Sequence, residues 1–194
     1  MACTSRASWE IAGQTGIGVL GLTLFVGVET LAEEIAAYRR ALGTARPVGA
    51  FVNDRCAAYT IVHCASTDAA ARAHGAPEAA LWYLTYAFQV LARQVEPERH
   101  LLEVASDDPY RQVAIENPVV RRALDGTLTF EELDAQDMVV IGDPDRCIRK
   151  LERYRAAGLD RVLCLMQAGR LAHQDVLASI RLFGEHVIPH FARD

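Results

Sequence analysis

The sequence lacks an apolar segment continuous enough to cross a membrane. Its most apolar stretch, residues 11–28, is interrupted by five glycines and by Gln14, Thr15 and Thr23, whereas a spanning helix needs about 20 predominantly apolar residues. No basic segment precedes this stretch, as one would in a secretory signal peptide. We therefore expect a cytoplasmic protein without a membrane partner.

Clusters of basic residues are also missing. The chain has 20 Lys and Arg against 25 Asp and Glu, which gives a formal net charge of −5. Nucleic acids and anionic membranes attract basic surfaces, so this balance argues against either as the main partner.

The cysteines lack the paired C-x-x-C spacing of many metal and redox sites. An odd number of cysteines in a cytoplasmic protein favours reduced, buried thiols. Alternation along a strand places His63 on the opposite face from Cys56 and Cys64, so we expect no metal site there. The five cysteines are Cys3, Cys56, Cys64, Cys147 and Cys164.

What the sequence does contain is an alternation of short apolar runs and amphipathic helical patterns, which indicates an α/β fold. We expect strands at 17–20, 56–64 and 160–167, the last one buried, with a strand stub at the N-terminus and an extended segment at 48–52. The expected helices cover 28–42, 68–74, 78–94, 119–124, 130–135, 145–157 and 174–187.

With 194 residues, about half of them apolar, the chain fits one domain better than two. We expect a single domain, 1–194, in three parts. Residues 1–95 hold the first βα units, residues 96–136 form an irregular insertion, and residues 137–194 hold the final βα unit. The insertion is expected because the segment is polar and broken by proline and glycine.

A hydroxyl-rich loop with Thr4 and Ser5 precedes a further, short helix, which we expect to begin after Ser5 and to be stopped by Gly13 and Gly16. If Thr4 and Ser5 lie where a strand ends and the helix begins, their hydroxyls join free N–H groups at the positive end of a helix dipole, where anions bind. Ser8 lies in the first turn. The alternative is that Ser5 and Ser8 only cap the helix, and both interpretations remain open.

The same stretch contains the pattern Gly-x-Gly-x-x-Gly at Gly16, Gly18 and Gly21. A dinucleotide site requires a strand before the first glycine and a helix opening at the last. Here a helix precedes the glycines and they interrupt the strand itself, which argues against that site.

Two further features have alternative explanations. His63 is the only histidine that we place on a strand, and a buried, hydrogen-bonded structural role is favoured over a catalytic one. The expected helix at 78–94 carries many aromatic side chains, which favours packing, with a substrate or partner surface as the alternative. These aromatic residues include Trp82, Tyr83 and Tyr86.

Taken in order, several motifs resemble the C-terminal half of luciferase-like flavin-dependent monooxygenases. The resemblance rests on residues 4–20 (TSRASWEIAGQTGIGVL), 28–39 (VETLAEEIAAYR), 141–145 (IGDPD), 157–167 (AGLDRVLCLMQ) and 180–189 (IRLFGEHVIP). It implies a partial TIM-type (β/α) barrel. It also implies that Thr4, Ser5 and Ser8 hold the phosphate of reduced flavin mononucleotide (FMN) or a deazaflavin. TIM barrels in general bind phosphate after strands seven and eight, which would favour Gly169 and Arg170; we prefer the placement that the family implies and expect these two residues to line the mouth of the site.

The implied activity is that of an oxidoreductase or monooxygenase, in which reduced flavin activates dioxygen to oxidise a small organic substrate. A flavin reductase is an implied partner. Because the family's first half supplies most contacts to the flavin ring, closure of the barrel implies a homo-oligomer or a complementing N-terminal half. The alternative is a non-catalytic truncated barrel that binds flavin or a partner chain. No catalytic residue is assigned.

Overall fold

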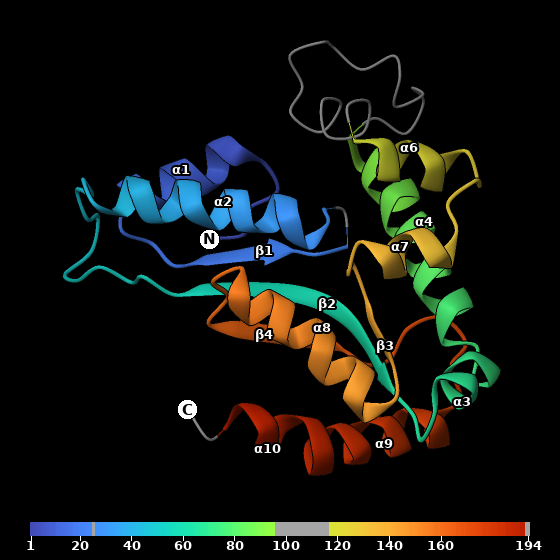
Figure 1. The fold of residues 1–194 in the computed structure, drawn as a ribbon. Coiled ribbons are helices and arrows are strands. Elements are labelled where there is room, and N and C mark those ends of the chain that lie inside the picture. Colours follow the sequence, from blue (N-terminus) through green and yellow to red (C-terminus); the bar gives the residue numbers. More distant parts are fainter. Residues whose placement is uncertain (25, 96–116, 193–194) are drawn as a thin grey trace.

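The computed structural model of the chain describes residues 1–24, 26–95 and 117–192. Four parallel strands form its sheet: β1 (Val19–Leu22), β2 (Cys56–Cys64), β3 (Val140–Gly142) and β4 (Arg161–Leu165) (Figure 1). The fold is therefore α/β, as the sequence predicts. The predicted strand stub is present as an isolated parallel bridge between Ala2 and Leu20.

The helices match most of the predicted ones, with shifts of one to a few residues at their ends. Of the predicted insertion, 96–136, residues 96–116 lie outside the described part of the chain. The bounds are α1 (Arg6–Gln14), α2 (Val28–Leu42), α3 (Asp68–Ala73), α4 (Ala76–Val95), α6 (Pro118–Leu124), α7 (Phe130–Ala135), α8 (Pro144–Ala156), α9 (His173–Leu182), the π-helical turn η2 (Phe183–Val187) and α10 (Ile188–Phe191).

Strand β2 is the centre of the sheet, since each other strand pairs with it. Successive residues of β2 direct their backbone N–H and C=O groups to opposite edges of the strand. The carbonyl of Tyr59 accepts from the residue after β1, and the N–H of Ala65 donates to the last residue of β3, whereas the carbonyl of Cys56 accepts from the residue before β4. Strands β1 and β3 therefore follow one another along one edge of β2, and β4 lies along the other.

The two faces of β2 pack into separate hydrophobic cores. Cys56, Ala58 and Val62 face a core with α1, α2, α8 and η2, whereas Ile61 and Tyr59 face a core with α4, α6 and α7. Side chains of successive strand residues point to opposite faces, and the pattern of apolar residues in β2 supplies both. Helices therefore cover both faces of the sheet.

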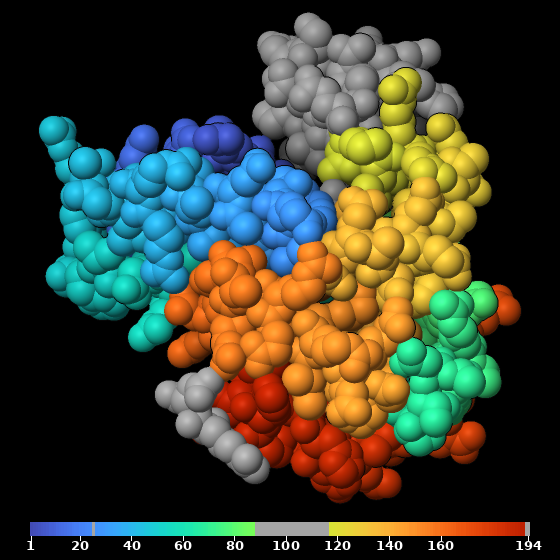
Figure 2. Space-filling view, viewed as in Figure 1, coloured from blue at the N-terminus to red at the C-terminus, as the bar shows by residue number. Residues whose placement is uncertain are grey.

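Helices α1 and α2 lie in close contact, and small residues make this contact possible. A Cβ atom on Gly13 would lie 2.6 Å from the carbonyl oxygen of Tyr38, so only glycine fits between the helices. The rings of Trp9 and Tyr38, both fully buried, meet edge to face with centroids 6.4 Å apart. Figure 2 shows the two helices forming one surface beside the C-terminal part of the chain.

The structure corrects two of the predicted strands. The first strand begins at Val19 rather than at residue 17, because Gly16 turns the chain with φ of 69° and Ile17 still bonds back to α1. The last strand, β4, is not buried: Leu163 is 43% exposed, since β4 has a neighbour on one edge only within the described residues. The predicted extended segment 48–52 forms no strand and is exposed.

The predicted C-terminal helix is likewise interrupted. Helix α9 gives way to the π turn η2, and α10 completes the segment. The amphipathic pattern of residues 174–187 predicts a core face that includes Leu177, Ile180, Phe183 and Val187. In the structure Leu177 and Ile180 are 38% and 46% exposed, whereas Phe183 and Val187 are buried. Within the described residues, no helix has the length and apolar character that crossing a membrane requires.

Candidate functional site at the carboxyl end of the sheet

The hydroxyl-rich loop lies at the carboxyl end of the sheet. Ala2 pairs in parallel with Leu20, so two residues further on Thr4 is level with Leu22, the last residue of β1. Helix α1 then begins, and its N-terminus faces the same end. This is the edge at which open α/β sheets and barrels bind their ligands.

Ser5 and Ser8 form a reciprocal cap at the start of α1. The Ser8 hydroxyl donates to the carbonyl of Ser5 (2.6 Å) and accepts from its N–H (3.2 Å), and the Ser8 N–H donates to the Ser5 hydroxyl at 3.4 Å. Ser5 and Ser8 therefore cap helix α1, as one of the two interpretations predicts. The cap does not exclude a ligand, because Ser5 and Ser8 stay partly exposed.

The first turn of α1 fits an anion. The backbone N–H groups of Arg6 and Ala7 make no hydrogen bond to the described residues, and the first turn carries no acidic side chain. Thr4 is exposed next to them. Free N–H groups at the positive end of the helix dipole attract phosphates and carboxylates. Arg6, which pairs with Glu10 at 3.3 Å, adds a positive charge nearby.

Gly169 and Arg170 follow β4, at the opposite edge of the sheet. Gly169 has φ of 53°, and a Cβ atom there would lie 3.0 Å from the Cα atom of Ala79, so the glycine lets this loop rest on α4. Arg170 is exposed. Three strand spacings separate this loop from Thr4, or roughly 14 Å. A single phosphate therefore contacts one of the two groups, and the sequence-predicted residues form two separate parts of this end of the sheet.

Near the end of β2, a buried histidine pair lies beneath the same edge. His63 is fully buried, and its Nε2 atom lies 3.0 Å from Nδ1 of His74, whose Nε2 atom is 3.9 Å from a carboxylate oxygen of Asp175. Burial, together with the neighbouring His74, lowers the pKa of His63 below its usual value. The Nδ1 atom of His63 has no partner among the described residues.

This arrangement supports the structural role predicted for His63. Its partners escaped the sequence analysis, because His74 and Asp175 lie on different helices and no spacing rule links them to a strand residue. The hydrogen bond between His63 and His74 joins β2 to the end of α3, and the approach of His74 to Asp175 extends this contact to α9. An imidazole buried in this way stays neutral at physiological pH.

The aromatic residues of α4 serve two purposes. Tyr83 faces β2, where its hydroxyl lies 2.8 Å from that of Tyr59. Trp82 and Tyr86 stack in parallel with centroids 5.1 Å apart, and each is 52% exposed. The packing role predicted for this helix is thus confirmed for Tyr83, while the stacked pair lies on the surface.

The glycines of the N-terminal pattern have steric roles rather than a nucleotide-binding one. Gly16 makes the turn after α1, and a Cβ atom on Gly18 would lie 2.8 Å from the side chain of Asn53. A Cβ atom on Gly21 would lie 2.5 Å from the ring of Trp9. Among the residues that the structure describes, no group of three or more His, Cys, Asp or Glu side chains is placed to hold a metal.

Comparison with solved structures indicates the same fold. The chain resembles monooxygenase RslO1 from Streptomyces bottropensis, with a TM-score of 0.58 and 18% identity over 98% of this chain and 47% of that one. It resembles the oxygenating constituent of 3,6-diketocamphane monooxygenase from Pseudomonas putida, solved in complex with FMN, with a TM-score of 0.57 and 18% identity over 97% and 47%.

A third similar structure is the coenzyme F420-dependent tetrahydromethanopterin reductase from Methanopyrus kandleri, with a TM-score of 0.56 and 20% identity over 98% of this chain and 50% of that one. The chain thus spans about half the length of these proteins, and its fold corresponds to part of a TIM-type barrel. No curated protein matches the sequence. The family model described as luciferase-like monooxygenase matches residues 1–161, so the chain belongs to the luciferase-like monooxygenase family.

Proposed function

We propose that the chain is the flavin-binding part of an oxidoreductase that acts on a small organic substrate. Within this class, we propose a monooxygenase. The observation that supports this most directly is the start of α1, where Thr4, Ser5, Ser8 and two free backbone N–H groups converge without an acidic side chain. These residues would hold the phosphate of FMN. Gly169 and Arg170 would line the mouth of the site.

The same anion site suits FMN or a deazaflavin, because both cofactors carry a phosphate. One structural relative contains FMN and another is F420-dependent. A reduced flavin supplies the electrons for reduction of dioxygen, and we propose reduced FMN, delivered by a flavin reductase, as the cofactor. We propose a cytoplasmic location.

The residues of this chain contribute binding rather than proton transfer. Helix α1 supplies the anion site through its dipole and its free N–H groups. His63 is fully buried and bonded to His74, so it orders the end of β2 instead of meeting substrate. Buried residues near the strand ends, such as Cys64 and Ile141, would exclude water from one side of a bound cofactor.

A second chain is part of the proposal. Within the described residues β4 pairs with β2 alone, and Leu163 on β4 is 43% exposed. An exposed edge strand offers unpaired N–H and C=O groups to another strand. We propose that a second copy of the chain, or a complementing N-terminal half, pairs here and supplies the remaining contacts to the flavin ring.

The same open strand favours one alternative, a non-catalytic partial barrel that binds flavin or a partner chain without turnover. Native mass spectrometry of the purified chain with FMN, together with an assay for oxidation of the reduced flavin, distinguishes the two. A complex of two or more chains carrying FMN, with substrate-dependent oxidation of the reduced flavin, supports the enzyme. Flavin binding without oxidation supports the alternative, and a monomer that binds no flavin contradicts both functions for this chain alone.

The phosphate site is tested by comparing FMN with riboflavin, which lacks the phosphate. We expect the Thr4→Val substitution to weaken FMN binding by about 1 kcal/mol, the value of one hydrogen bond, and to leave riboflavin binding unchanged. Thr44→Val, at an exposed threonine after α2, is the matched control. Equal loss for FMN and riboflavin would place the phosphate elsewhere.

A further inference from the structure

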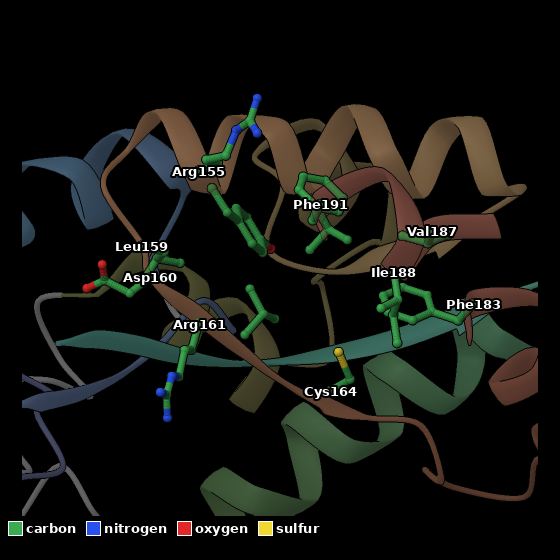
Figure 3. A pocket seen from close by; sticks show the side chains of 12 residues that line it. Arg155, Leu159, Asp160, Arg161, Cys164, Phe183, Val187, Ile188 and Phe191 are labelled. Atoms are coloured by element: carbon green, nitrogen blue, oxygen red, sulfur yellow. The ribbon is translucent and has the colours of Figure 1, made fainter. Parts of the chain in front are cut away.

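A pocket lies away from the carboxyl end of the sheet. Its volume is about 400 Å³, and it lies between β4, α8 and the segment η2–α10 (Figure 3). Protein cores seldom leave voids larger than a water molecule, whereas small-molecule sites measure about 300–1,000 Å³. The lining residues are Leu151, Tyr154, Arg155, Leu159, Asp160, Arg161, Val162, Cys164, Phe183, Val187, Ile188 and Phe191.

We propose that this pocket binds a neutral, apolar small molecule of aromatic or short alkyl type, which packs against Phe183 and Phe191 and covers the thiol of Cys164. The proposal is independent of flavin binding. The pocket opens beside the first residues of β4, whereas the flavin phosphate is assigned to the opposite, carboxyl end of the sheet.

The charged residues of the lining indicate a neutral ligand. Asp160 is already compensated, because its carboxylate lies 3.1 Å from Arg39 and accepts from the N–H of Cys56 at 2.7 Å. Arg155 pairs with Glu152 at 3.0 Å. Figure 3 shows the guanidinium groups of Arg155 and Arg161 turned away from the pocket. No charge is therefore directed at a bound molecule, and an anion gains nothing there.

The local geometry of the C-terminal segment is a second, independent indication. Phe183 and Val187 lie at the ends of the π turn η2, which is closed by the Ile188 N–H donating to the carbonyl of Phe183. Single π turns within α-helices are rare and occur frequently at functional sites. Here the wider turn places two buried apolar side chains on the same wall of the pocket.

Cys164 provides a built-in reporter of occupancy. It is the only one of the five cysteines that is exposed, and Figure 3 shows its sulfur turned into the pocket. The surrounding apolar groups desolvate the thiol and raise its pKa to about 11. A molecule bound in the pocket would cover this sulfur and slow its alkylation.

The test uses the neutral fluorescent probe N-phenylnaphthylamine and its anionic relative anilinonaphthalene sulfonate. We expect saturable fluorescence enhancement with the neutral probe and much weaker binding of the anionic one. Cys164→Phe fills the pocket, so it should weaken the neutral probe by at least about tenfold. Leu163→Phe adds the same ring on the opposite face of β4 and should leave the affinity within about twofold.

A second readout does not depend on a folded variant. In the wild-type chain at alkaline pH, saturating N-phenylnaphthylamine should slow modification of Cys164 by N-ethylmaleimide, measured by peptide mass spectrometry. Absence of saturable binding, equal affinity of the two phenylalanine variants, preference for the anionic probe, or an unchanged alkylation rate would each overturn the proposal. If circular dichroism shows Cys164→Phe to be unfolded, the alkylation rate decides.

Discussion

The Nε2 atom of His63 lies 3.0 Å from the Nδ1 atom of His74, and the two imidazole rings are perpendicular. A single proton occupies this hydrogen bond, so the pair is intact only while at least one facing nitrogen is unprotonated. Through Asp175, the pair also links β2 to α9. The contact between these elements is therefore sensitive to acid.

His63→Gln should reduce the dependence of stability on pH. The pKa of His63 is lowered by burial and then by His74, so in acid the unfolded chain binds a proton that the folded chain resists. The stability from this group is complete above the unfolded pKa of about 6.5 and falls as the pH drops through the folded pKa. Urea unfolding at about pH 7.5 and pH 5 measures the difference. His173→Gln, at an exposed histidine of α9, should keep the wild-type dependence.

Glu34→Gln should also change the dependence of stability on pH, but Glu34 makes the wild-type chain less stable as the pH rises, whereas His63 makes it less stable as the pH falls. Burial, followed by repulsion from Glu33, raises the pKa of Glu34 to about 7 from 4.5. The folded chain therefore holds a proton that the unfolded chain loses between these values, so wild-type stability falls as the pH rises from 4.5 through 7. We expect the substitution to stabilise above pH 7 and to have little effect below pH 4.5, as thermal melts can show. Glu185→Gln, on the exposed part of η2, serves as the control.

Lys150→Met should be among the most destabilising substitutions on α8. Lys150 is the only lysine of the chain, and its Nζ atom lies 2.7 Å from both the carboxylate of Asp137 and the carbonyl of Asp134. Asp137 keeps its ion pair with Arg153, so removal of Lys150 costs the buried hydrogen bonds to Asp137 and Asp134 rather than a whole ion pair, at about 1–3 kcal/mol. Arg149→Met, at the exposed neighbour, should change the free energy of unfolding by less than about 0.5 kcal/mol. Similar values for both would show that the pair contributes little.

Gly21→Ala should destabilise the N-terminal unit by about 1–3 kcal/mol, because the added methyl group overpacks a closed contact. Its Cβ atom would lie 2.5 Å from the ring of Trp9, which is itself fully buried. Gly184→Ala is the matched control, since no atom lies within 4 Å of its added Cβ. There, a gain of up to about 1 kcal/mol is expected from helix propensity. Chemical denaturation of both variants decides, and an unaffected Gly21→Ala chain would mean that Trp9 moves freely.

Periodicity predicted most elements well because their signals are local. The strand Cys56–Cys64 and the helix Val28–Leu42 have the bounds that the sequence indicates. Likewise, Asp143 caps α8 through the Arg146 N–H at 2.7 Å, with Pro144 at the first position. Turn and cap chemistry depends on neighbouring residues, which the sequence contains directly.

Burial was harder to predict, because it depends on which strands become neighbours. The run Arg161–Leu165 is apolar enough for an inner strand, yet Leu163 and Cys164 are exposed because β4 has one neighbour among the described strands. The prediction of five buried cysteines was wrong for this reason at Cys164. The flavin contacts assigned to Thr4, Ser5, Ser8, Gly169 and Arg170 stay predictions.

The central position of β2 also determines the order in which the chain can fold. The N–H of Cys56 donates to the carboxylate of Asp160, 104 residues later, so one edge of the central strand stays unsatisfied until residue 160 has been synthesised. Contacts that span such a separation slow folding, and they expose apolar strand edges to other nascent chains in the meantime. During synthesis, β2 therefore depends on its β1 edge until β4 has been made and can pair with its other edge.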